Sequence, residues 1–76
     1  MTTVKVKLEL AENVKQFNNI VSQYPGDVDL RSGRYVVDAK SILGILSLDL
    51  SAPVIMEIHG EHPEELIERI GDYLET

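Results

Sequence analysis

The sequence predicts an α+β fold, an open-faced sandwich in which helices cover one face of a four-stranded antiparallel sheet. Apolar and polar residues alternate in four short segments, which is typical of strands with one buried side. Between these segments the apolar residues are three or four positions apart, which is typical of amphipathic helices. The resulting order is βαββαβα, with three helices on one face, and we expect residues 1–76 to form a single domain.

The first half of the chain predicts a strand, a helix and a hairpin. Apolar and polar residues alternate strictly over residues 4–10, whereas residues 14–24 have a helical spacing of apolar positions. Residues 27–31 and 34–38 alternate again. Ser32-Gly33 separates these two segments, and glycine suits a tight turn that needs a positive φ. We therefore expect an antiparallel hairpin here.

The second half predicts a helix, a strand and a last helix. Ser41 precedes an apolar run over residues 42–50, and a serine hydroxyl at this position can accept a backbone N–H of the first turn, so we predict that Ser41 is the N-cap. Residues 54–59 alternate as the fourth strand, which Gly60 ends. Pro63 then lies just inside the last helix, whose acidic first turn suits the positive end of the helix dipole.

The helix after Ser41 has more apolar residues than one buried face needs. A helix that buries one face has about three or four apolar positions in two turns, and residues 42–50 exceed this. In one interpretation most of them face the sheet, because so small a domain has little else to bury. In the other, which we favour, the surplus forms a docking patch for another protein. The residues expected to contact a partner are Lys40, Ile42, Leu43, Leu46 and Ser47.

Composition excludes several classes of function. The formal net charge of −6 argues against sequence-independent binding to nucleic acid or to an anionic membrane. The chain has no cysteine, so it has neither a disulfide nor a thiol nucleophile, and no apolar stretch has the length of a signal peptide or a membrane span. We expect a cytoplasmic protein that is not an enzyme. His59 and His62 lack further ligands for a zinc site, and we expect neither a metal nor another cofactor.

The string AKSILGILSL at residues 39–48 carries a resemblance to a known family. Together with the chain length and the order of elements, it resembles the HPr family, the small phosphocarrier proteins of the bacterial sugar phosphotransferase system. The resemblance covers essentially the whole chain and implies a sheet in the spatial order 1-4-2-3. It also implies that Ser41 is a regulatory phosphorylation site, because Gram-positive relatives are phosphorylated on the corresponding serine by a dedicated kinase. The simpler alternative is that Ser41 only caps its helix.

The resemblance further implies that the family's phosphocarrier site is degenerate in this chain. In the family, a histidine at the start of the first helix is the nucleophile, and an arginine and a proline follow it. Aligned without gaps to the hairpin, Leu10 takes the place of the histidine, Glu12 that of the arginine and Asn13 that of the proline. Leucine cannot accept a phosphoryl group, and Glu12 would repel one. His59 and His62 are expected at the opposite end of the sheet from this site.

Two classes of function remain open. We favour a regulatory or protein-interaction module that binds its partner through the Ser41 helix; the partners implied are phosphotransferase-system enzymes, a serine kinase or a transcriptional regulator. The alternative is a phosphocarrier component that accepts phosphate at another residue. An unrelated binding module with the same element order is a third option, and a different strand order would favour it. A homodimer through the exposed sheet face or the Ser41 helix is also left open.

Overall fold

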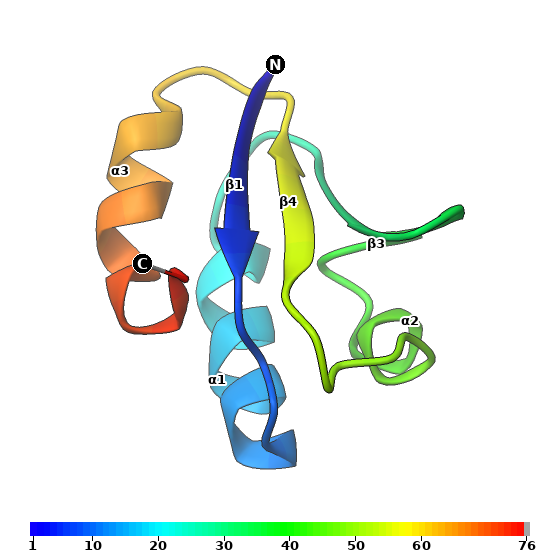
Figure 1. Ribbon diagram of the computed structural model, residues 1–76. Helices are drawn as coiled ribbons and strands as arrows, with labels where there is room; N and C mark the ends of the chain where they lie inside the picture. The colour runs from blue at the N-terminus through cyan, green and yellow to red at the C-terminus, as the bar shows by residue number, and fades with distance from the viewer. Residues whose placement is uncertain (76) are drawn as a thin grey trace.

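The computed structural model describes residues 1–75 and confirms the predicted architecture (Figure 1). Four strands form one antiparallel sheet in the order β1-β4-β2-β3. The strands are β1 (Thr2–Val6), β2 (Val28–Ser32), β3 (Tyr35–Asp38) and β4 (Val54–Ile58). The helices are α1 (Ala11–Ser22), α2 (Ile42–Leu46) and α3 (Pro63–Arg69), and a short 3₁₀ helix, η1 (Gly71–Tyr73), follows. Within residues 1–75, no helix is long and apolar enough to span a membrane.

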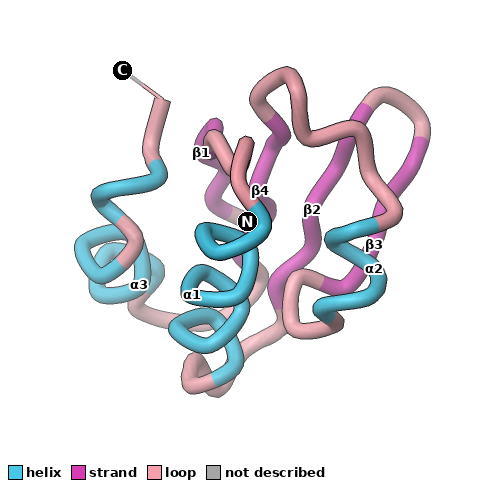
Figure 2. The backbone as a smooth tube through the Cα atoms, turned by 90° about the horizontal axis from the view of Figure 1, so that it is seen from below, coloured by secondary structure: helices cyan, strands magenta, loops and turns pink. Residues whose placement is uncertain are grey.

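The core lies between the sheet and the helices, which all occupy one side of it (Figure 2). Leu30 at the centre of β2 lies opposite Met56 of β4 and Val37 of β3, and both Leu30 and Met56 are fully buried. From the helix side, Phe17 of α1 is fully buried, and the ring of Tyr73 meets it edge-on with centroids 5.9 Å apart. In β1 and β2 more buried and more exposed side chains alternate, as predicted. No residue of β3 is fully buried, and in β4 Glu57 is buried between Met56 and Ile58.

The first strand is shorter than predicted. The alternation continues to residue 10, but β1 ends at Val6, which pairs with the first residue of β4, Val54. Pro53 precedes Val54 and has no N–H to donate, so the pairing of β1 with β4 does not continue beyond Val6. Leu8 is buried as expected, whereas Leu10 is 56% exposed and does not face the core.

The hairpin is confirmed, but its turn lies one residue later than predicted. Ser32 pairs with Tyr35, so Gly33 and Arg34 form the two-residue connection. Gly33 has a φ of +59°, and Arg34 does not have a positive φ. A positive φ at the first central position alone is the signature of a type II′ turn, which favours glycine at that position and matches the twist of the paired strands.

The helix after Ser41 is also shorter than predicted: α2 ends at Leu46 instead of residue 50. The Ser47 hydroxyl donates to the Gly44 carbonyl at 2.6 Å, and its backbone N–H also turns back to Gly44. Such local hydrogen bonds from serine compete with continued helix formation. Asp49 accepts hydrogen bonds from the Ser51 N–H and hydroxyl, which stabilises the turn that leads to β4.

Gly26 and Gly60 allow two loops to approach each other closely at one end of the sheet. A Cβ atom on Gly60 would lie 2.8 Å from the Gly26 Cα and 2.5 Å from the Tyr24 hydroxyl, which donates to the Glu61 carbonyl. We expect Gly60→Ala to lower the free energy of unfolding by about 1 to 3 kcal/mol, because the backbone of the facing loop must move. Urea denaturation followed by circular dichroism measures this change.

Gly71→Ala is the matched control for Gly60→Ala. A Cβ on Gly71 meets no atom within 4 Å, so this substitution is expected to change the free energy of unfolding by less than about 0.5 kcal/mol. Equal losses for the two variants would contradict the close approach of Gly26 and Gly60.

Candidate functional site: the α2 patch and the N-terminus of α1

Exposed apolar side chains gather on α2, which packs beside β3 (Figure 2). Within α2 only Ile45 is buried, whereas Leu43 is 78% exposed and Leu46 is 49% exposed. The interpretation in which Ile42, Ile45, Leu46 and Leu50 face the sheet, with Leu43 outside, is therefore wrong for Leu46 and Ile42, which is 37% exposed. It is correct for Ile45, and Leu50 is partly buried against the core. We use the name α2 patch for the exposed apolar residues of this helix, Ile42, Leu43 and Leu46.

Ser41 is the N-cap of α2, as predicted. Its backbone is extended, with φ −96° and ψ 108°, and its Oγ accepts the Gly44 N–H at 3.2 Å. The side chain is exposed beside the α2 patch. Gly44 allows close packing, since a Cβ there would approach both the Ser41 Oγ and the Val37 Cβ at 3.3 Å. Ser41, as the capping residue, and the α2 patch thus lie side by side on the surface.

Lys40 lies next to Ser41 in sequence, but its charge is held elsewhere. Its Nζ donates to the backbone carbonyl of Tyr24 at 2.6 Å, just beyond the C-terminus of α1, where a cation suits the helix dipole. Its backbone N–H donates to the Asp38 carboxylate at 2.9 Å. These bonds fix the start of α2 relative to α1. They place the ammonium group of Lys40 on α1 rather than at the Ser41 hydroxyl.

A shallow groove of about 680 Å³ runs between β3 and the end of α2. It is lined by residues 32–37 and 47–49, so Ser47 lies at its rim. Hydrogen bonds from the Ser51 hydroxyl and backbone N–H lower the pKa of Asp49, which keeps a negative charge at one side of the groove. The groove is not apparent from sequence reasoning, because it depends on α2 lying against the edge strand. The only sequence signal is the apolar pair Tyr35 and Val36, which points to both faces of that strand.

The N-terminus of α1 brings together the residues that the sequence predicts to form a degenerate carrier site. Leu10 is the N-cap residue; it is extended and exposed, and its side chain makes no capping bond. Its carbonyl accepts the N–H groups of Asn13 and Val14 at 3.0 and 3.1 Å. Glu12 is exposed in the first turn. The residue that begins the helix thus has no nucleophilic atom, and a carboxylate lies next to it.

Both histidines lie at the other end of the sheet, as expected. Because β4 runs antiparallel to β1, its last residues lie where β1 begins, whereas α1 starts beyond the end of β1 (Figure 1). His59 follows β4 directly, and its backbone N–H donates to the Asp27 carbonyl at 2.9 Å. His62 precedes α3, where its Nδ1 lies 3.4 Å from a Glu64 carboxylate oxygen. Neither imidazole can replace Leu10 at the start of α1.

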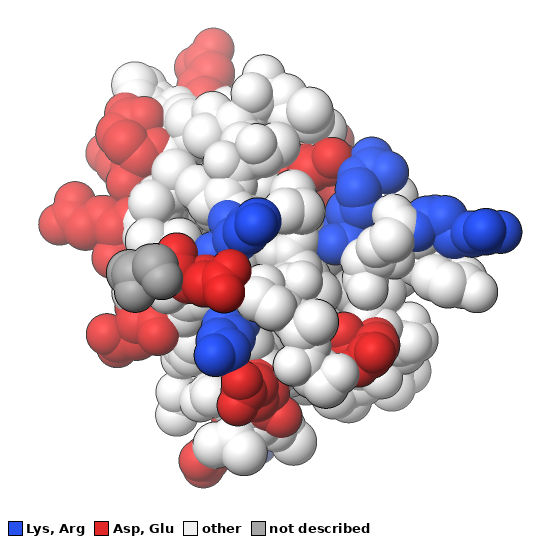
Figure 3. All heavy atoms as spheres, in the orientation of Figure 1, with Lys and Arg blue, Asp and Glu red and all other residues white. Residues whose placement is uncertain are grey.

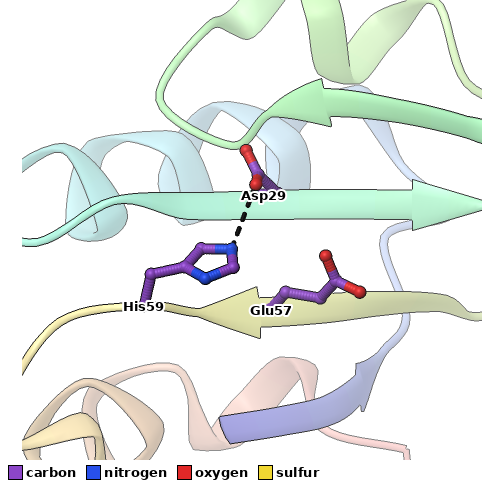
Figure 4. Close-up of side chains that lie close together, drawn as sticks. All are labelled: Asp29, Glu57 and His59. Atoms are coloured by element: carbon purple, nitrogen blue, oxygen red, sulfur yellow. Dashed lines mark hydrogen bonds and ion pairs between the residues drawn. The ribbon is translucent and has the colours of Figure 1, made fainter. Parts of the chain in front are cut away.

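His59 belongs to a cluster of charged side chains on the open face of the sheet (Figure 4). Ligand atoms of Asp29, Glu57 and His59 lie within 4.8 Å of one another. His59 Nε2 is 3.1 Å from Asp29 Oδ2, and Arg31 Nε donates to Glu57 Oε2 at 3.0 Å. Both oxygens of Glu57 are within hydrogen-bond distance of Arg31, so a cation would have to displace the guanidinium. We therefore interpret the cluster as a network of cross-strand polar contacts, with one ion pair between Arg31 and Glu57, and do not assign a metal to it.

Comparison with known proteins identifies the family. Residues 2–76 match the family model described as "PTS HPr component phosphorylation site". The chain belongs to the HPr family. A comparison with curated proteins gives no match. The family assignment and the observed strand order 1-4-2-3 exclude the third option, an unrelated binding module.

Solved structures of two HPr proteins and of Crh resemble most of the chain. HPr-C-His from Thermoanaerobacter tengcongensis has 26% identity and a TM-score of 0.82, over 95% of this chain and 89% of the other. Phosphocarrier protein HPr from Bacillus anthracis has 25% identity and a TM-score of 0.78, over 97% and 94%. Crh, the Bacillus subtilis catabolite repression containing protein, has 29% identity and a TM-score of 0.70, over 92% and 82%; its structure is described as an intertwined dimer with a swapping domain.

Proposed function

We propose that the chain is a non-enzymatic, regulatory HPr-family protein that binds a protein partner through the α2 patch and does not carry phosphate on a histidine. The observation that carries this proposal is the contrast between two helix starts. Ser41 caps α2 beside an exposed apolar surface, whereas α1 begins at Leu10, which offers no nucleophile. The exposed apolar side chains of α2 thus support a docking function, whereas the start of α1 has no side chain that supports a carrier function.

The surface chemistry of α2 supports docking. Leu43 is 78% exposed, and the partly exposed Ile42 and Leu46 lie on the same helix. The fold of this chain leaves these apolar side chains in contact with water. Contact with an apolar partner surface removes such side chains from water, which stabilises a complex by about 25 cal/mol for each Å² buried before the costs of association. A phosphotransferase-system enzyme or a transcriptional regulator is the partner class that the family suggests. The likeness to Crh, named for catabolite repression, supports a regulatory role.

The N-terminus of α1 argues against transfer through the family's carrier position. A phosphoryl group carries nearly two negative charges at neutral pH. At this position the phosphoryl group would face the carboxylate of Glu12. A second carboxylate, Glu9, precedes Leu10 and is paired with Lys7 at 3.3 Å. The alternative, a phosphocarrier that uses another residue, is supported by the family model alone. The two proposals differ in whether a phosphoryl group from the general phosphotransferase enzyme reaches the chain.

Phosphorylation of Ser41 would regulate docking in this proposal. The Oγ is exposed and already accepts the Gly44 N–H, so a phosphate added there meets donors of the first turn without burying charge. It would also place a dianion at the border of the α2 patch. A partner that packs on Ile42 and Leu43 would then have to accommodate this charge, whereas a partner with a basic pocket would gain an ion pair.

Ser41→Ala tests this regulation. Incubated with a serine kinase that phosphorylates HPr proteins and with ATP, the wild-type chain is expected to gain one phosphate by intact mass, and Ser41→Ala to gain none. Ser22→Ala is the matched control, an exposed serine at the C-terminus of α1 and outside the α2 surface, and it should be modified like the wild type. Loss of the Ser41 cap should also lower the free energy of unfolding by about 1 kcal/mol. Equal modification of wild type and Ser41→Ala would contradict the assignment.

A further inference from the structure

The two edges of the sheet differ in how they are covered. Along β1, the Lys7 N–H donates to the Tyr73 carbonyl at 2.7 Å, and the Glu75 N–H donates to the Lys5 carbonyl at 3.0 Å. A bridge between Val6 and Leu74 belongs to the same contact, which covers the C-terminal end of the β1 edge. Along β3, no strand of the described chain pairs with the outer edge (Figure 1). An uncovered edge strand is a template for pairing with another chain.

The register of the hairpin determines which backbone groups of β3 face outward. A two-residue hairpin closes on a hydrogen-bonded pair, here Ser32 and Tyr35, and hydrogen-bonded and non-bonded pairs then alternate. Ala39 continues the series, since its N–H donates to the Val28 carbonyl of β2 at 2.9 Å. Val36 lies in the opposite phase and pairs with Arg31 without hydrogen bonds. Its N–H and C=O therefore point away from the sheet.

We propose that two copies of this protein associate by antiparallel pairing of β3 with β3, with Val36 opposite Val36 of the second copy. In this register each Val36 donates its N–H to the other's carbonyl. Arg34 then lies opposite Asp38 of the second copy, and Tyr35 lies opposite Val37. The sheets of the two copies join into one, and no segment is exchanged, in contrast to the swapped dimer described for Crh.

Charge complementarity favours a second copy as the occupant of this edge. Asp38 lies opposite Asp29, which in turn lies opposite Glu57, so three carboxylates form a row across neighbouring strands. Like charges opposite one another destabilise a sheet unless cations offset them. Arg31 forms an ion pair with Glu57, and the His59 ring lies within hydrogen-bond distance of Asp29, but within residues 1–75 no Lys or Arg side chain pairs with the Asp38 carboxylate. Arg34 of the second copy would supply this cation, and symmetry gives the contact twice.

The Arg34 side chain fits this role. It is exposed at the tip of the hairpin and forms no ion pair within the described residues. In the view of Figure 3, the largest group of basic side chains lies at the side of the molecule where β3 lies, and acidic side chains crowd the side of α3. The edge therefore has a cation, Arg34, on one side of Val36 and an anion, Asp38, on the other. A 180° rotation between two copies brings each Arg34 opposite the Asp38 of the other.

Exposed apolar surface supports the same register. Tyr35 is 69% exposed and Val36 is 46% exposed, although both belong to a strand of the sheet. Centring the pairs on Val36 covers Val36 on the open face and brings Tyr35 beside Val37 on the helix face. A shift by one residue would place Val36 opposite Val37, whose N–H and C=O point inward to β2, so the two residues could not exchange hydrogen bonds and the register is specified.

The test is the oligomeric state of the full chain measured by sedimentation velocity over a range of concentrations. We expect a concentration-dependent dimer for the wild type. Val36→Lys places two ammonium groups opposite each other and should give a monomer at every concentration at which the wild type dimerises. Arg34→Asp should raise the dimer dissociation constant at least about tenfold, through the loss of two ion pairs and the repulsion that replaces them. Lys15→Asp, the same charge change on the exposed side of α1, should leave it unchanged.

Charge exchange identifies the contact. Asp38→Arg should weaken the dimer as Arg34→Asp does, and the variant with both substitutions should dimerise within about threefold of the wild type, because the two positions would again carry opposite charges, with their signs exchanged. Thermal unfolding of each variant checks the fold, since Asp38 also accepts the Lys40 N–H. A wild type that stays monomeric up to about 1 mM would overturn the proposal. So would a dimer that persists in Val36→Lys, or a double variant that remains as weak as the single ones.

Discussion

Leu43→Glu is expected to weaken binding of the protein partner by about 100-fold without changing the stability of the fold. Leu43 is 78% exposed at the centre of the α2 patch, so it contributes little to the core. In a complex, the carboxylate would have to leave water for an apolar contact without a compensating partner, and central interface residues carry most of the binding energy. The free energy of unfolding should stay within about 0.5 kcal/mol of the wild type.

The measurement for Leu43→Glu uses the wild-type chain and the variant as parallel baits, followed by calorimetric titration with the partner that the wild type captures. Leu10→Glu is the matched control, because it makes the same substitution at an exposed leucine on the N-terminus of α1. Binding that is lost with Leu10→Glu and kept with Leu43→Glu would move the docking surface from α2 to α1 and contradict the proposal.

Alternation and helical spacing predicted the four strands and the three α-helices but not η1, and they placed several boundaries wrongly. The stripe of the last helix runs to Leu74, whereas α3 ends at Arg69. The helix α1 begins at Ala11, whereas its apolar pattern begins only at Val14. The pattern misses the first turn because Ala11, Glu12 and Asn13 include no large apolar side chain. The pattern also extends to Tyr24, which is buried although it lies beyond the helix. Periodicity reports burial, and burial does not end where helical hydrogen bonds end.

The α2 patch was predictable because it depends on composition alone. Any short helix with that many apolar residues must leave some of them exposed, and the exposed ones include Leu43 and Leu46. The uncovered edge of β3 was not predictable from the residues themselves, since it follows from the strand order. In the same way, the row of Glu57, Asp29 and Asp38 joins residues that are far apart in the sequence and meet only through the register of three strands.

Two substitutions at the start of α1 are expected to give the chain a site that accepts a phosphoryl group from the general phosphotransferase enzyme, which we expect the wild type to lack. The wild type, incubated with the general phosphotransferase enzyme and phosphoenolpyruvate, should keep its mass. The double variant Leu10→His and Glu12→Arg should gain an acid-labile phosphate. Residue 10 is the exposed, extended N-cap of α1, so an imidazole there would be accessible and next to the free N–H groups of the first turn. Arginine at position 12 would replace a repulsive charge with a bidentate partner for phosphate.

Leu10→His alone separates the two contributions. With Glu12 retained, the imidazole has a nucleophilic nitrogen but faces a carboxylate, so labelling should be about tenfold slower than in the double variant. Intact mass before and after acid treatment distinguishes phosphohistidine from phosphoserine, because only the former is lost in acid. An acid-labile gain in the wild type would overturn the proposal, since His59 and His62 would then be the only imidazoles available. Failure of the double variant would instead show that residue 10 does not correspond to the family's histidine, and would leave docking through α2 to be decided by Leu43→Glu.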